Sequence, residues 1–168
     1  MRLQNLTLEN FRSHEKKEFS FGERDNLVIF TGGNGAGKTN IIEAMYVLSC
    51  TRSFRTMRRE EMIKEGANHF RIGAVMADDA GEECQAEVFF QSLPLKSRFK
   101  WNDVPMSAGG FFGKFPAVLF LPEDLSMITD APKVRRAFLD MLLASVSRKY
   151  MEALSQYQKA LRSRNSLL

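Results

Sequence analysis

Residues 32–39, with the sequence GGNGAGKT, have the types and spacing that bind phosphate groups. They match the pattern G-x-x-x-x-G-K-[ST] through Gly32, Gly37, Lys38 and Thr39. Glycines let the backbone turn tightly, so that successive N–H groups point inward, and a helix that follows adds positive potential at its first turn. The sequence therefore predicts a loop that holds the α- and β-phosphates of a nucleotide.

The residues of this loop are expected to have different roles in nucleotide binding. Lys38 would reach the β- and γ-phosphates, and the hydroxyl of Thr39 would coordinate Mg²⁺. The backbone around the phosphates would come from Gly32, Gly33, Asn34, Gly35, Ala36 and Gly37. ATP and Mg²⁺ are the expected cofactors. A glycine-rich turn that binds nothing is the alternative, and the flanking sequence disfavours it.

The segments on either side of the loop have the order that a phosphate loop requires. Residues 27–30, LVIF, form a short apolar run, typical of a strand buried on both faces in a parallel sheet. Over residues 38–49 apolar side chains recur at helical spacing, at Ile41, Ile42, Met45 and Leu48. Strand, glycine-rich turn and helix therefore follow one another.

Hydrolysis of a bound nucleotide needs groups that the loop lacks. A carboxylate or Gln must position the attacking water, and an Asp at the end of an apolar strand helps to hold the magnesium ion. The nearest such pattern is FLPED at 120–124, where Pro122 separates the apolar run from Asp124. Another, AVMAD at 74–78, fits a hairpin end better. We therefore expect no catalytic residue in this sequence.

The other β-rich runs predict a sheet. Strands are expected over residues 2–9 and 18–21, and over 117–121 as a further strand of the central sheet. Three more runs, at 69–76, 84–90 and 97–101, are separated by turn residues and predict an antiparallel meander.

The last part of the sequence predicts two helices. Apolar residues recur at helical spacing after Pro132, with Asp130 as the expected N-cap, and again from Ser147 onward. The last helix is still amphipathic where the sequence stops and has no capping glycine, so we interpret the chain as truncated.

Composition narrows the class of protein. The chain has 168 residues, of which 44% are hydrophobic and 26% charged, as in globular proteins. Its net charge of +4 suits a polyanionic partner and also an ordinary surface. Cys50 and Cys84 form no disulfide or zinc pattern, and neither a signal peptide nor an apolar run of membrane-spanning length is present. We expect a cytoplasmic protein.

Basic residues cluster after the first predicted helix and in the last two. Such clusters can neutralise DNA phosphates without reading bases, while solvated helix faces and contacts between two lobes have the same composition. The candidates for DNA binding or for a lobe interface are Arg55, Arg58, Arg59, Arg135, Arg136, Arg162 and Arg164.

Motifs along nearly the whole chain resemble those of the RecF family of bacterial recombination-mediator ATPases, relatives of SMC and ABC-type ATPases. Besides the phosphate loop, they are NFRSH at 10–14, IEA at 42–44, RSFR at 52–55, FLPEDL at 120–125, RR-x-FLD at 135–140 and Y-x-x-x-L-x-x-RN at 157–165. They occur in the family's order, which makes the resemblance more specific than a phosphate loop alone.

The resemblance implies an α/β fold of the P-loop NTPase class, specifically an ABC/SMC-type head. Its mixed sheet with an antiparallel meander would form a first lobe over residues 1–130, and a helical lobe would begin over 131–168. Family members are longer, so the chain resembles their N-terminal half. The signature motif and the Walker B Asp are missing, and hydrolysis by this part alone is not expected.

The resemblance also implies a function in DNA repair, replication and the SOS response. In the family, ATP drives dimerisation on double-stranded or gapped DNA, and the dimer helps RecO and RecR to load recombinase on single-stranded DNA. Asn34 would contact the γ-phosphate, Asn40 would position the loop, and Arg12 and Ser13 would lie near the nucleotide. Residues 123–124 would belong to a loop that senses the γ-phosphate.

Two other classes of function share this loop. A small nucleotide or metabolite kinase would pass the γ-phosphate to an acceptor, but it needs an arginine-bearing lid and an acceptor pocket, which the meander at 69–101 does not provide. A folded module could also use the loop only as a structural nucleotide site.

Overall fold

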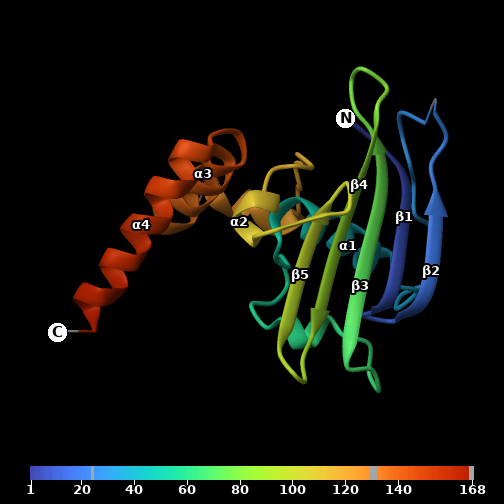
Figure 1. Cartoon of the computed structure of the whole chain (residues 1–168), viewed down its shortest axis with the longest axis horizontal. Coiled ribbons are helices and arrows are strands. Elements are labelled where there is room, and N and C mark those ends of the chain that lie inside the picture. Colours follow the sequence, from blue (N-terminus) through green and yellow to red (C-terminus); the bar gives the residue numbers. More distant parts are fainter. Residues whose placement is uncertain (24, 129–131, 167–168) are drawn as a thin grey trace. The chain divides into compact units, whose positions relative to one another are not determined.

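The computed structural model describes residues 1–23, 25–128 and 132–166 (Figure 1). It divides into two compact units, Met1–Ala117 and Val118–Leu168. The expected N-cap at Asp130 lies outside the described residues, as does the expected boundary between two lobes at 130 and 131, which stays a prediction.

The first unit contains one six-stranded sheet. Its strands are β1 (Arg2–Phe11), β2 (His14–Ser20), β3 (His69–Ala77), β4 (Glu83–Gln91), β5 (Lys96–Trp101) and β6 (Val104–Met106). They are ordered β2-β1-β3-β4-β5-β6, and every neighbouring pair is antiparallel. The predicted meander is confirmed as β3, β4 and β5. Strand β1 is paired on both sides, with β2 and with β3, so the strand that leads into the β1–β2 turn is held by two neighbours.

The helix α1 (Lys38–Cys50) covers one face of the sheet, behind the strands in Figure 1. Alternate strand residues and one stripe of the helix meet in this core, where burying each large apolar side chain contributes about 1.5–3 kcal/mol. Its fully or nearly fully buried members include Leu6, Leu8, Phe11, Val47, Leu48, Phe70, Ile72 and Met76. The short α2 (Ala108–Phe111) adds Phe111, whose ring centroid lies 5.5 Å from that of Phe99.

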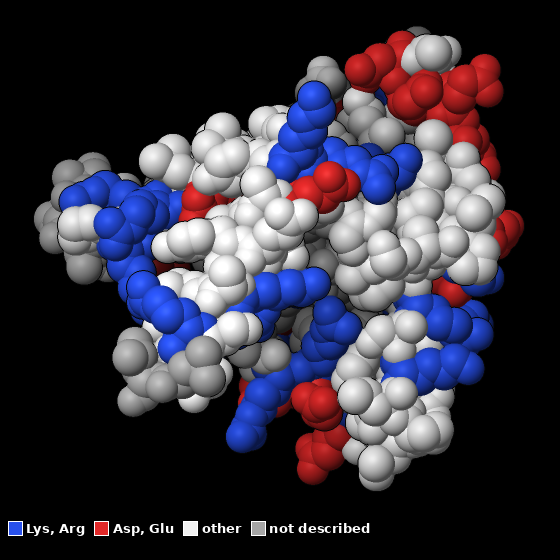
Figure 2. Space-filling model, turned by 60° about the vertical axis from the view of Figure 1, so that its left-hand side comes forward, with Lys and Arg blue, Asp and Glu red and all other residues white. Residues whose placement is uncertain are grey.

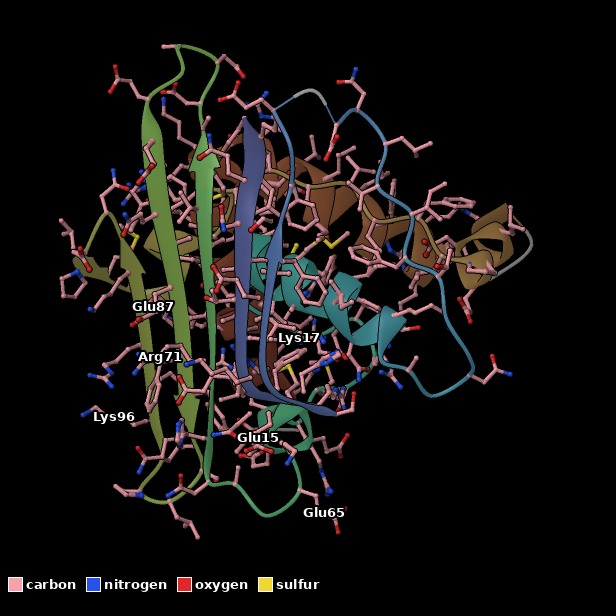
Figure 3. The ribbon with its side chains drawn as sticks, turned by 90° about the vertical axis from the view of Figure 1, so that its right-hand side faces the viewer. Glu15, Lys17, Glu65, Arg71, Glu87 and Lys96 are labelled. Atoms are coloured by element: carbon pink, nitrogen blue, oxygen red, sulfur yellow. The ribbon has the colours of Figure 1, made fainter. Side chains whose placement is uncertain are left out.

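The opposite face of the sheet is polar. The Arg71 guanidinium lies between Glu9 and Glu87, 3.8 Å from each carboxylate (Figure 3). On the same face the Arg98 guanidinium covers the ring of Phe89, 4.5 Å from its centroid. Successive side chains along these strands therefore point alternately to the apolar face under α1 and to the opposite, charged face.

Two apolar runs were wrongly predicted to be strands of the central sheet. Residues 27–30 and 117–121 have no strand hydrogen bonding, and Leu27, Ile29, Val118 and Phe120 are 77%, 71%, 90% and 70% exposed. A strand needs a neighbour that pairs with its N–H and C=O groups. Among the described residues neither run has one, so the sheet is antiparallel rather than mixed.

The second unit is helical, as predicted. After the 3₁₀ helix η2 (Pro122–Ile128) it contains α3 (Pro132–Val146) and α4 (Arg148–Asn165). The hydroxyl of Ser147 caps α4 by accepting a hydrogen bond from the N–H of Tyr150. The Tyr150 hydroxyl donates to Asp140 over 2.6 Å, which joins the two helices. Within the described ranges, no helix is long and apolar enough to cross a membrane.

Tyr46 predicts a pH dependence of stability. Its buried ring packs edge-on against Phe54, and burial, assisted by Cys50, raises its pKa from 10.0 to about 12. A raised pKa favours the protonated folded state, so this stabilisation is complete below pH 10 and is lost as the pH rises towards 12. In urea denaturation, the free energy of unfolding of the wild type should therefore fall more steeply over this interval than that of Tyr46→Phe. Equal slopes would contradict the expectation.

Candidate functional site

The predicted phosphate loop leads directly into α1. Gly32, Gly35 and Gly37 have φ angles of 147°, 81° and 87°, which side-chain-bearing residues rarely adopt. A Cβ atom at Gly37 would lie 2.6 Å from Nε2 of His14 and 2.9 Å from Oγ of Ser13. Only glycine therefore lets α1 begin this close to the turn between β1 and β2.

Lys38 folds back onto the loop. Its ammonium group donates hydrogen bonds to the carbonyl oxygens of Gly32 and Gly33, both over 2.7 Å. A phosphate oxygen carries a negative charge and is a stronger acceptor than a carbonyl. A phosphate beside the loop can therefore replace these carbonyls as the partner of Lys38. The neighbouring side chains of Asn34 and Thr39 are exposed.

A buried carboxylate lies one turn further along α1. The Glu43 side chain is 0% exposed, and its two oxygens accept hydrogen bonds from Nε and Nη2 of Arg12, over 2.9 and 2.6 Å. The hydroxyl of Ser53 donates a third hydrogen bond to it. A bidentate arginine with a further donor is the arrangement that a carboxylate shielded from water requires.

Arg12 joins Glu43 to two other segments. It lies in the turn between β1 and β2 with a left-handed φ of 53°, which costs a residue other than glycine about 1–2 kcal/mol. Its backbone N–H donates to the carbonyl of Met62, and its Nη1 donates to that of Glu61 in η1 (Arg59–Met62). The structure therefore gives Arg12 a supporting position beside the loop, and its predicted contact with a nucleotide stays a prediction.

Asn40 connects the same turn to the segment after α1. Its Nδ2 donates to Oγ of Ser13 over 2.9 Å, and its Oδ1 accepts from Nη1 of Arg55 over 2.9 Å. The same Nη1 lies 3.4 Å from Glu43. Nε2 of His14 lies 3.3 Å from the carbonyl oxygen of Gly37. Side chains from two other segments thus fasten the beginning of α1, where Asn40 was expected to position the loop.

Sequence reasoning did not predict the contacts that four residues make in this arrangement, namely His14, Glu43, Ser53 and Arg55. All four lie in motifs that resemble the RecF family, and Glu43 left a further signal as a charged residue beside Ile41 and Ala44 in the buried part of α1. Its partners come from positions 31 and 10 residues away, which a helical pattern does not reveal.

The carboxylates that were weighed as magnesium ligands stabilise local turns. Oδ2 of Asp124 accepts from the N–H of Leu121 at the start of η2. Oδ1 of Asp78 accepts from the N–H groups of Ala80 and Glu82, which confirms its interpretation as a hairpin end. In the part of the chain that the structure describes, no three acidic, His or Cys side chains gather to hold a metal ion.

The basic candidates have different surroundings. Arg59 donates to Ser97 and lies over the ring of Phe99, while Arg58 is exposed and lies 3.8 Å from Glu61. On the two long helices, exposed candidates are Arg135, Arg136, Arg162 and Arg164. On the face drawn in Figure 2, Lys and Arg form several separate groups.

The two glycines Gly35 and Gly37 give a matched test of this packing. Alanine at either position has to adopt a positive φ, at a cost of about 1–2 kcal/mol. A Cβ at Gly35 meets nothing within 4 Å, whereas one at Gly37 overlaps with His14 and Ser13. In chemical denaturation Gly37→Ala should therefore lose about 1–3 kcal/mol more stability than Gly35→Ala. Equal losses would show that α1 does not begin tightly against the turn.

Comparisons with known proteins agree with this geometry. An AAA domain family profile matches residues 5–104, more than half of the chain. The DNA replication and repair protein RecF of Ruminiclostridium cellulolyticum is 40% identical over the whole chain, and that of Leptospira interrogans is 37% identical. The chain spans 45% and 46% of the lengths of these two relatives.

Solved structures support the expected class of fold. The structure of the recombination mediator protein RecF with ATP has a TM-score of 0.90 and 31% identity, covering 99% of this chain and 44% of that one. An SMC ATPase structure has a TM-score of 0.68 at 17% identity over 84% of this chain, which bears on the fold alone. The fold is thus that of RecF and SMC ATPase heads. The chain belongs to the AAA domain family, and it is similar over its whole length to RecF.

Proposed function

We propose that this chain is the phosphate-binding part of an ATP-binding DNA replication and repair protein of the RecF type. The main support is the glycine loop at the start of α1, where the Lys38 ammonium group donates hydrogen bonds to the carbonyl oxygens of Gly32 and Gly33. The similarity of nearly the whole chain to RecF with ATP, at a TM-score of 0.90, adds to it.

In this proposal the loop recognises phosphate through charge and backbone N–H groups. The Lys38 ammonium moves from the carbonyls of Gly32 and Gly33 to phosphate oxygens, and the first turn of α1 presents its N–H groups to the same anion. Thr39 and the phosphates would supply the oxygen ligands that Mg²⁺ prefers, and the ion would neutralise phosphate charge when bound.

Hydrolysis requires more than these residues. The two carboxylates weighed as magnesium ligands, Asp78 and Asp124, each accept hydrogen bonds from the backbone of their own turns. We propose that the complete protein works as an ATP-dependent dimer, in which a partner head supplies the missing γ-phosphate contacts. Its action on double-stranded and gapped DNA, together with RecO and RecR, is part of the same proposal.

DNA contact would depend on exposed basic side chains that reach backbone phosphates. Arg58 of the first unit and Arg162 and Arg164 of α4 are exposed and suited to this. Arg59 is less suited, because its guanidinium lies on Phe99 and Ser97. Binding of this kind is independent of base sequence and weakens with salt.

A titration of the chain with ADP and with ATP tests the nucleotide site. Lys38→Ala should lose about 1.5–3 kcal/mol of binding free energy, the contribution of a hydrogen bond to a charged group. This loss is roughly a ten- to hundredfold rise in Kd, measurable by calorimetry. We expect similar affinities for ATP and ADP, because contacts to the γ-phosphate from a partner head are missing.

Lys96→Ala is the matched control, because Lys96 is an exposed lysine at the start of β5 (Figure 3). Its affinity for nucleotide should equal that of the wild type. If Lys38→Ala bound nucleotide as tightly as the wild type, the proposed site would be refuted. Strong dimerisation of the chain with ATP but not with ADP would refute the expectation that the chain does not prefer ATP to ADP. Transfer of phosphate to a small acceptor without DNA would favour a kinase instead.

A further inference from the structure

Glu43 is a fully buried carboxylate on the helix that begins at the phosphate loop. It lies near the loop, yet it is enclosed by protein groups and not directed at solvent where a ligand could reach it. A buried charge is costly unless several donors surround it. Its position on α1 therefore calls for an explanation other than contact with a nucleotide.

Three segments meet at this carboxylate. Arg12 from the β1–β2 turn binds both oxygens, and Ser53 and Arg55 reach it from the segment after α1. Ser53 is itself fixed, because its oxygen also accepts from the backbone N–H groups of Arg55 and Thr56. Removing the charge of Glu43 would leave two arginines and a serine hydroxyl without their common acceptor.

The contacts continue from Glu43 to the loop. Arg55 holds Asn40 as well as Glu43, and Asn40 in turn holds Ser13, the neighbour of Arg12. Gly37, the residue before Lys38, lies against the side chains of Ser13 and His14. Hydrogen bonds thus connect the buried carboxylate of Glu43, through Arg55 and Asn40, to the β1–β2 turn, which lies against Gly37 at the end of the loop.

We propose that Glu43 is a positioning residue for the phosphate loop, an inference that rests on the proposed function. By pairing with Arg12 and Arg55, Glu43 holds the start of α1 against the β1–β2 turn, so that the loop has its binding conformation before a nucleotide arrives. A loop that is already ordered loses less conformational entropy on binding, and the affinity is higher. The effect applies to the α- and β-phosphates and is therefore the same for ADP and ATP.

Glu43→Gln is the direct test, because glutamine keeps the shape but presents an NH₂ group to donors that need an acceptor. Val47→Ala is the matched control: Val47 is equally buried, lies one turn further along α1, and belongs to the apolar core. Both variants should lower the melting temperature. Only Glu43→Gln should raise the Kd for ADP, by about tenfold or more, as is usual when a group that orients a binding residue is lost.

Amide hydrogen exchange over residues 31–42 of the nucleotide-free chain gives a second readout. Exchange should be faster in Glu43→Gln than in Val47→Ala, and this result does not require that the chain bind nucleotide. If Glu43→Gln does not fold, Arg55→Ala takes its place with the same expected results, because Arg55 is half-exposed and alanine removes the bonds to Asn40 and Glu43.

The outcomes separate the inference from the proposed function. Unchanged exchange and unchanged Kd in Glu43→Gln would overturn the positioning role, as would equal changes in Val47→Ala. If the wild type and Lys38→Ala alike failed to bind ADP, the proposed function would fall. Faster loop exchange in Glu43→Gln alone would then still support Glu43 as the residue that orders the loop.

Discussion

The ion pair between Arg12 and Glu43 is the interaction on which the candidate site depends. A carboxylate with no exposed surface has to be matched by donors, and Arg12 supplies two of them from a turn 31 residues away in sequence. To do so, Arg12 takes a left-handed backbone conformation with a φ of 53°. The same turn then presses against the beginning of α1, where only glycine fits at position 37. One buried carboxylate thus joins three segments, namely α1, the β1–β2 turn and the segment after α1.

The antiparallel sheet supplies the rigid support for this pair. Because β1 is paired on both sides, by β2 and β3, the turn after β1 cannot shift without breaking two ladders. The apolar face of the sheet holds α1 at a fixed depth through residues such as Leu8 and Val47. The polar face needs no such cover, because its charges pair with one another, as Arg71 does with Glu9 and Glu87. Residues 31–36 of the loop are exposed, and side chains of the β1–β2 turn contact its end at Gly37 and Asn40.

Local patterns were sufficient for much of the fold and for the loop. The spacing of glycines before Lys38 and the apolar stripe of residues 38–49 predicted the start of α1, and the turn at Asp78 predicted the hairpin of β3 and β4. The runs at 27–30 and 117–121 were wrong, because an apolar run becomes a strand only beside a partner, which composition does not reveal. The pairing of Arg12 with Glu43 was not predicted, since a long-range pair leaves no periodic signal, and the expected place of Arg12 near the nucleotide stays a prediction.

A crystal structure of the chain with ADP would test most directly whether a preformed support holds a phosphate loop here. We expect the phosphates at the first turn of α1, with the Lys38 ammonium moved from Gly32 and Gly33 to a phosphate oxygen. The Arg12–Glu43 pair should keep both of its hydrogen bonds. Phosphate bound away from residues 32–39 would contradict the site, and a broken Arg12–Glu43 pair would contradict the support.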